Sequence, residues 1–135
     1  GDVGLLRSLD GLDAKQASES ANGGATIAAH ARHVAYGLAL MNRWAREGGN
    51  PFADANWDAA WKTSRVSERE WADIRSELRS EIEGWLAILG QSREVSETEL
   101  KGMIGSVAHL SYHLGAIRQI AKSARGPKEG AFPSR

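Results

Sequence analysis

The stretch GGATIAAHARHVAYGLALMNRW, residues 23–44, decides how this chain folds. Two glycines interrupt the chain, and Thr26 follows them in the position of a helix N-cap, where its hydroxyl can accept a hydrogen bond from a backbone N–H of the first turn. Apolar side chains then recur with the period of an α-helix. The pattern predicts a helix from Thr26 to about Arg46, which a Gly-Gly pair and Pro51 bring to an end.

Two capping boxes of the form Ser-x-x-Glu begin further helices, at Ser67 and Ser96. In each box the serine and the glutamate can satisfy each other's backbone N–H groups in the first turn. Gly90 ends the first of these helices, and Gly126-Pro127 ends the second. Residues 12–20 can add a turn after a short N-terminal helix. The four expected helices cover residues 2–9, 26–46, 67–89 and 96–124.

These amphipathic segments predict an all-α fold, a four-helix bundle formed by a single domain over residues 1–135. A long connection, residues 47–66, joins the second helix to the third. It carries Trp57 and Trp61, whose large apolar rings are expected to pack over the bundle rather than remain in water.

The chain contains 17 basic and 17 acidic side chains and no cysteine. Balanced, scattered charge argues against nucleic acid or an anionic membrane surface as a partner. The lack of cysteine removes disulfides, thiolate zinc sites and an internal thiol nucleophile. No segment reaches the roughly 18 apolar residues of a membrane helix, and the N-terminus lacks a signal-peptide pattern, so a soluble cytoplasmic domain is expected.

The four histidines form two close pairs, each on one predicted helix. His109 and His113 are four residues apart, so both side chains leave the same face, one turn apart, and can reach one ion at about 2 Å. A third imidazole from the other pair would leave coordination positions open for water or substrate, as in a catalytic metal site. The alternative is that the histidines are hydrogen-bonded packing residues.

The residue pattern leaves open whether His30 or His33 supplies that third imidazole. On a helical wheel His30 lies nearer the middle of the apolar arc and His33 nearer its edge, so amphipathicity alone favours His30 as the inward residue. Other metal motifs are missing from the sequence. The lack of Glu-x-x-His argues against a ferritin-like di-iron site, and the lack of His-Glu-x-x-His excludes a zincin protease.

Three segments together resemble the DinB-like (DinB/YfiT) family of metal-binding four-helix bundles. They are residues 23–44, the connection DANWDAAW at 54–61 and HLSYHLGAIRQI at 109–120. The resemblance covers about residues 10–120, although the expected first helix is short for this family.

In that family a Gly-Gly-x-Thr motif is followed, seven residues after the threonine, by a ligand histidine, and a later His-x-x-x-His supplies two more ligands. The resemblance therefore implies that His33, His109 and His113 hold a divalent ion such as zinc or nickel. His30 is then a neighbour that contacts a ligand, or the alternative ligand. Gly115 matches the glycine that often follows the second motif.

The resemblance also implies an enzyme that activates a water or a low-molecular-weight thiol, as a thiol S-transferase, an isomerase or a hydrolase. Bacillithiol and mycothiol are thiols of this kind. Trp57, Tyr112 and Arg118 are candidates for substrate contact. Asp54 and Asp58 are the nearest candidates for a general base, and no catalytic residue is assigned.

The alternative function is a non-catalytic bundle that binds a metal or a small molecule, such as a stress-associated interaction protein. In either case the expected partners are a small molecule and a second copy of the chain. A homodimer is expected because bundles of this kind often pair through flat apolar helix faces.

Overall fold

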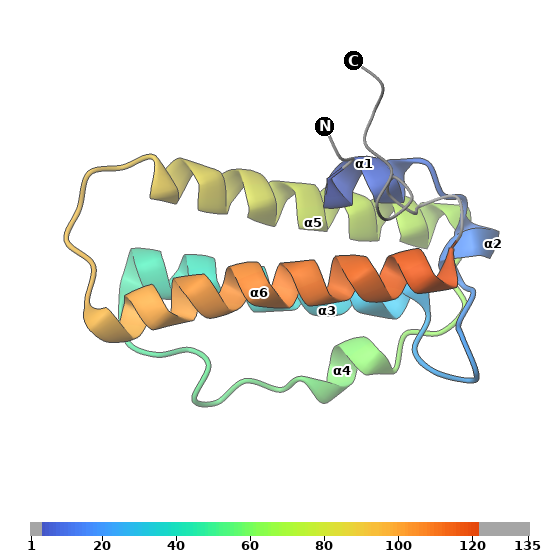
Figure 1. The fold of residues 1–135 in the computed structure, drawn as a ribbon, viewed down its shortest axis with the longest axis horizontal. Coiled ribbons are helices and arrows are strands. Elements are labelled where there is room, and N and C mark those ends of the chain that lie inside the picture. The colour runs from blue at the N-terminus through green and yellow to red at the C-terminus, as the bar shows by residue number, and fades with distance from the viewer. Residues whose placement is uncertain (1–3, 122–135) are drawn as a thin grey trace, which may run out of the picture.

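The computed structural model describes residues 4–121. In this range the chain forms helices joined by loops, with an isolated β-bridge between Ser20 and Thr26. Three long helices run alongside one another, and shorter helices lie at one end and along one side (Figure 1). The predicted all-α class is confirmed. The helices of the described range are α1 (Leu5–Asp10), α2 (Ala14–Ala17), α3 (Ile27–Glu47), α4 (Asp58–Trp61), α5 (Glu68–Leu89) and α6 (Glu97–Ile120).

Side-chain caps fix the starts of α3 and α5, as the sequence predicts. Thr26 Oγ1 accepts a hydrogen bond from the N–H of Ala29 at 3.2 Å. Ser67 and Glu70 form a complete capping box, in which each backbone N–H donates to the other side chain, at 2.7 and 3.1 Å. These bonds satisfy backbone donors that the first helical turn leaves without a partner.

The capping box predicted at the start of α6 forms only in part. The N–H of Glu99 donates to Ser96 Oγ at 3.1 Å, but the Glu99 carboxylate accepts hydrogen bonds from Arg93 instead of reaching back to Ser96. A guanidinium offers a carboxylate charge-assisted hydrogen bonds, which are stronger than one bond from a neutral N–H. The serine alone therefore caps α6.

α3 lies at the centre of the core because it packs against both other long helices. Its interface with α5 is mainly apolar, and Trp71 at the start of α5 is fully buried there. The Trp71 indole N–H donates to the Leu12 carbonyl at 2.8 Å, which ties the N-terminal segment to α5. The buried apolar residues of α3 and α5 include Ile27, Val34, Leu38, Met41, Trp71, Ile74, Leu78 and Trp85.

The short elements differ most from the prediction. The first helix begins at Leu5, and the predicted start at residue 2 lies outside the described residues, as does the predicted end of the last helix near residue 124. The turn expected within residues 12–20 is confirmed as α2. The connection contains α4, which the prediction lacks because four residues are too few to show a helical period.

Over residues 4–121 no helix is both long enough and apolar enough to cross a membrane.

Candidate metal centre

The four histidines meet between α3, which carries His30 and His33, and α6, which carries His109 and His113. His109 Nε2 lies 2.9 Å from His33 Nε2 and 2.9 Å from His113 Nε2. The packing of α6 on α3 thus brings together residues that are 76 positions apart in the sequence. Three ring nitrogens from two helices converge on one place.

Hydrogen bonds among the three imidazole rings do not account for this convergence. His109 Nε2 carries either one hydrogen or one in-plane lone pair, so it can form one well-directed hydrogen bond, not two. Two neighbouring nitrogens nevertheless lie within hydrogen-bond distance of it. A single cation resolves the conflict, since it accepts lone pairs from all three nitrogens at once.

The spacing also fits a shared ion. Ligand nitrogens bind zinc at about 2.0–2.1 Å, so two nitrogens on one ion lie at most about 4.2 Å apart. The 2.9 Å separations fall within that limit. His33, His109 and His113 form the group of potential metal ligands found among the described residues, and the group contains no carboxylate. The set predicted for the metal is therefore brought together in space.

His30 lies beside this group and contacts one member of it. Its Nδ1 is 2.8 Å from Nδ1 of His113, whereas Nε2 of His113 is the ring nitrogen that lies close to His109. When His113 directs its Nε2 lone pair toward the other two rings, its Nδ1–H donates to His30. His30 is half-buried, whereas His33 is only 7% exposed. The helical-wheel preference for His30 as the inward residue is therefore wrong.

Two tryptophans from the connection hold the His33 ring. Trp61 in α4 stacks on it with ring centroids 4.2 Å apart, and Trp57 lies against it at 5.1 Å. His33 Nδ1 is buried without a hydrogen-bond partner in the described part of the chain. The orientation of His33 therefore depends on aromatic packing, and the expectation that both tryptophans pack over the bundle is confirmed.

Burial lowers the pKa of all four histidines. For His33 the pKa falls to about 4, and repulsion from the His109 and His30 imidazolium charges adds to the effect of burial. For His113 it falls to about 3, through burial and then repulsion from His109, His33 and His30. Both rings are therefore neutral at pH 7 and offer free lone pairs, the form that binds metal.

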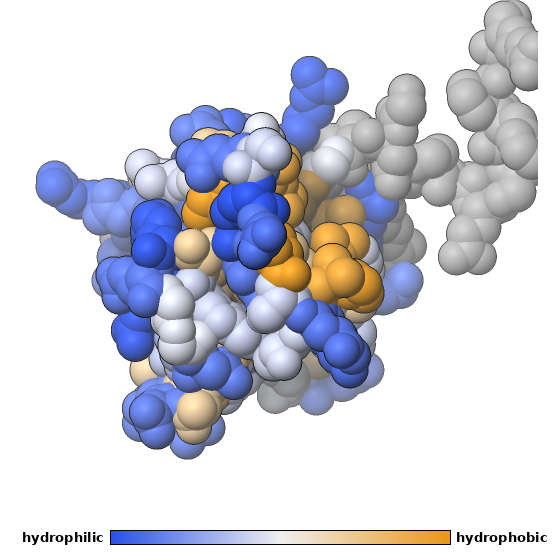
Figure 2. Space-filling model, turned by 90° about the vertical axis from the view of Figure 1, so that its left-hand side faces the viewer, coloured by the Kyte–Doolittle hydropathy of each residue, from blue (hydrophilic) through white to orange (hydrophobic). Residues whose placement is uncertain are grey.

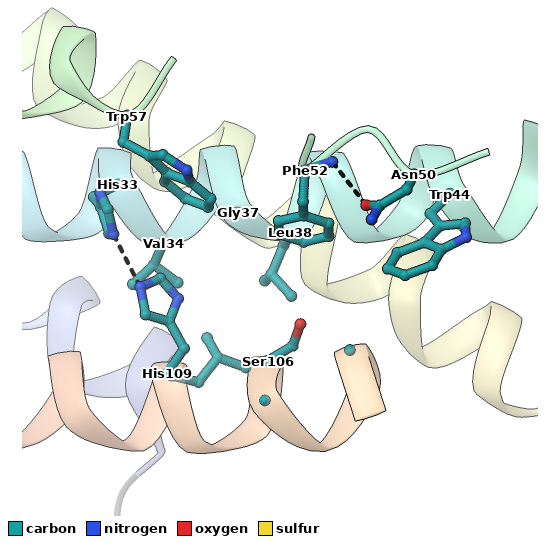
Figure 3. Close-up of a pocket in the computed structure, with 13 residues that line it drawn as sticks. His33, Val34, Gly37, Leu38, Trp44, Asn50, Phe52, Trp57, Ser106 and His109 are labelled. Carbon is teal, nitrogen blue, oxygen red and sulfur yellow. Dashed lines mark hydrogen bonds between the residues drawn. The ribbon is translucent and has the colours of Figure 1, made fainter. Parts of the chain in front are cut away.

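A cavity of about 400 Å³ opens beside the histidines. Figure 3 shows His33 and His109 at one end, Trp44 and Asn50 at the other, and Trp57 and Phe52 along one side. The remaining lining residues are Val34, Gly37, Leu38, Gly102, Gly105, Ser106 and Leu110. The cavity gives a small molecule access to two of the three converging imidazoles.

The other predicted site residues fall in different places. Trp57 lines the cavity beside the histidines. Tyr112 packs edge-on against His113 at 5.1 Å but is 70% exposed and does not line the cavity. Arg118, Asp54 and Asp58 are also not among the cavity-lining residues.

Trp44 and Phe52 line the cavity, and sequence reasoning missed both. The available signal was weak. Trp44 lies near the end of a helix, and Phe52 is one aromatic residue in an otherwise polar connection. Neither position indicates a ligand until the connection is seen to fold along α3.

Comparison of the chain with models of known protein families, with curated proteins and with solved structures gives no match. The chemistry of the site is therefore inferred from its geometry.

Proposed function

We propose that His33, His109 and His113 bind one divalent metal ion, zinc or nickel, in a DinB-like metal-dependent enzyme. The observation that carries the proposal is the convergence of three Nε2 atoms on one place, which one cation satisfies and hydrogen bonds do not. The ion would supply a Lewis acid that turns a bound water or low-molecular-weight thiol into a nucleophile near neutral pH.

The chain's own residues have separate tasks in this proposal. The three imidazoles are neutral, so they leave the charge of the ion undiminished. His30 accepts a hydrogen bond from His113 and fixes its tautomer, and Trp61 fixes the plane of His33. The cavity presents a substrate to the His33 and His109 end of the site. The nucleophile comes from solution, since the chain has no cysteine.

Metal binding tests the first half of the proposal. The protein, purified without an affinity tag, should contain about one equivalent of zinc or nickel by elemental analysis, or take it up on reconstitution. Replacing His33, His109 or His113 by alanine should weaken binding by more than 100-fold. His30→Ala is the matched control on α3 and should weaken binding only about 10–100-fold, as expected for a residue that contacts a ligand. Folded variants that all bind metal like the wild type would refute the site.

Catalysis tests the second half and separates it from the alternative. The metal-loaded protein should accelerate thiol addition to an electrophile, or ester and amide hydrolysis, above the rates of the metal-free protein and of His33→Ala. A protein that binds one ion and accelerates none of these reactions is the non-catalytic metal-binding bundle instead.

The expected homodimer remains part of the proposal. Apolar side chains lie exposed where α5 ends and α6 begins, and Figure 2 shows this end of the molecule with apolar surface between polar side chains. On α6 they recur at helical spacing, which gives one apolar stripe that a second copy can cover. The exposed apolar residues are Leu86, Leu89, Val95, Leu100, Ile104 and Val107.

A further inference from the structure

The cavity beside the histidines has one aromatic wall. Trp57, Phe52 and Trp44 follow one another along it, with ring centroids 6.0 Å apart between Trp57 and Phe52 and 5.9 Å apart between Phe52 and Trp44. Figure 3 shows this row running from the His33 end to the Asn50 end. Elsewhere in the lining, aliphatic side chains come from α3 and α6, namely Val34, Leu38 and Leu110. A flat ring system can lie along this wall in contact with several aromatic rings at once.

The lining carries no formal charge. No aspartate, glutamate, lysine or arginine lines this cavity within residues 4–121. Two other cavities differ, since one is lined by Arg32, Lys62 and Arg65 among others. The second contains Arg43, Glu47 and Asp54. Both of these cavities carry charged side chains, whereas the lining of the cavity that reaches the histidines carries none within residues 4–121.

Few polar groups remain to bind a ligand. Asn50 Oδ1 accepts a hydrogen bond from the Phe52 backbone N–H at 3.1 Å, which leaves the N–H groups of the Asn50 amide as neutral donors. Figure 3 shows the Ser106 hydroxyl pointing into the space between α3 and α6. The polar groups that the cavity can offer a ligand are therefore neutral: they include the Ser106 hydroxyl, the Asn50 amide and the imidazole nitrogens at one end, with no charged side chain to pair with an ionised group.

Glycines on α6 keep this space open. A Cβ atom at position 102 would lie 3.1 Å from Trp44 Cζ3, closer than most Cβ contacts, so glycine lets α6 approach the tryptophan. A Cβ atom at position 105 would meet no atom within 4 Å, so glycine there leaves volume that a larger side chain would occupy.

We propose that this cavity binds the uncharged, flat and apolar part of the substrate, with the reacting group held at the His33 and His109 end. As a statement about a substrate, this rests on the proposed function. As a statement about ligand class, it rests on the lining alone. An anionic ligand of the same shape is disfavoured because its charge would lose water without gaining an oppositely charged partner.

The test uses two probes of equal shape with the full-length, metal-free protein in EDTA at pH 7. The probes are 2-naphthylmethanol, which is neutral, and 2-naphthoate, which is anionic, and binding is measured by calorimetry and by amide shifts in NMR. The neutral probe should bind at least tenfold more tightly, and its amide shifts should fall on the cavity lining. Equal affinities, or tighter binding of naphthoate, would overturn the proposal.

Two glycine variants locate the binding. Gly105→Leu fills the cavity and should weaken binding of 2-naphthylmethanol at least tenfold. Gly115→Leu is the matched control, since it is also an α6 glycine whose Cβ would meet nothing within 4 Å, but it does not line the cavity. It should bind the probe like the wild type. Equal binding by both variants would place the probe elsewhere and overturn the proposal.

Because no metal is present in this test, its result is independent of the metal proposal. Selective probe binding by a protein that takes up neither zinc nor nickel would uphold the ligand class and refute the proposed function. Zinc or nickel uptake by a protein that binds neither probe would uphold the metal site and refute the ligand class.

Discussion

α3 has two long neighbours, and it packs against them in different ways. Toward α5 the interface is built from large buried apolar side chains such as Trp71, Ile74 and Leu78. α6, over Glu97–Ile120, buries only Glu99, His113 and Ile117, and between it and α3 lie the histidines and the cavity. One helix therefore has a face that stabilises the fold and another that holds a candidate site.

The difference teaches how a small domain can hold a site without losing its fold. Dense apolar packing contributes most of the favourable free energy of folding, whereas converging imidazoles and an open cavity contribute little of it. Placing the two on different sides of α3 allows the residues of one interface to change without removing the other. Four predictions test this separation, in order of decreasing effect.

The largest effect is expected in the α3–α5 interface. Trp71→Ala removes a fully buried indole and its hydrogen bond to Leu12, so it should lower the free energy of unfolding by about 3–5 kcal/mol. Urea denaturation in EDTA measures this change. Leu86→Ala, on the same helix but 60% exposed, should change stability by no more than about 0.5 kcal/mol. Similar losses in both variants would show that α5 is not the main stabilising partner.

The second effect belongs to the α3–α6 interface. Zinc at 100 times its dissociation constant should raise the free energy of unfolding of the wild type by about 2.7 kcal/mol, because the ion binds the folded state. His113→Ala should lose this increase. Trp85→Phe, a control substitution on α5, should show the same increase with zinc although its metal-free form is less stable than the wild type. Thermal denaturation with and without zinc gives the comparison. Undiminished stabilisation of His113→Ala would place the ion elsewhere.

A smaller effect is expected from acid. The pKa values of His33 and His113 in the folded protein, about 4 and about 3, lie below the 6.5 of an ordinary histidine. The unfolded chain therefore binds more protons between these values, and stability should fall as the pH is lowered from about 6.5 toward 3. Metal-free His113→Phe should show a shallower decline over this range. The same decline in wild type and variant would exclude His113 as its source.

The smallest effect on stability is expected on the outer face of α6. Ile104 is 63% exposed, so Ile104→Glu should change the monomer's stability by no more than about 0.5 kcal/mol. It should nevertheless weaken the proposed homodimer, because it puts a charge into the apolar stripe. Sedimentation velocity over a range of concentrations measures both proteins. A wild type that stays monomeric at the highest concentration would contradict the dimer.

Local signals in the sequence were enough to predict the long helices. Thr26 and Ser67 form the caps that their residue types favour, because an N-cap needs only residues of the same turn. The incomplete box at Ser96 was not predictable in the same way. Its glutamate bonds to Arg93, and whether a loop side chain reaches it depends on the course of the loop.

For the candidate site, too, the sequence predicts features that depend on nearby residues but not features that depend on distant segments. The spacing of His109 and His113 predicts their shared face, and the structure confirms it. The wheel failed at His30 and His33 because it assumes one buried arc, whereas α3 is covered by α5, α6 and α4. His33, at the edge of the predicted apolar arc, is buried by its contacts with Trp61 and with His109 of α6. The roles of Trp44 and Phe52 depend on where the connection lies, which no local pattern records.

The limited packing of α6, chiefly against α3, has a consequence for the dynamics of the protein. An element held by one neighbour can detach while the rest stays folded, so amide hydrogens of α6 should exchange with solvent through a partial opening that costs less free energy than global unfolding. Detachment separates His109 and His113 from His33. A bound ion should therefore oppose this partial opening. Amide hydrogens of α6 should exchange more slowly with the metal than without it, and those of the other helices should not change.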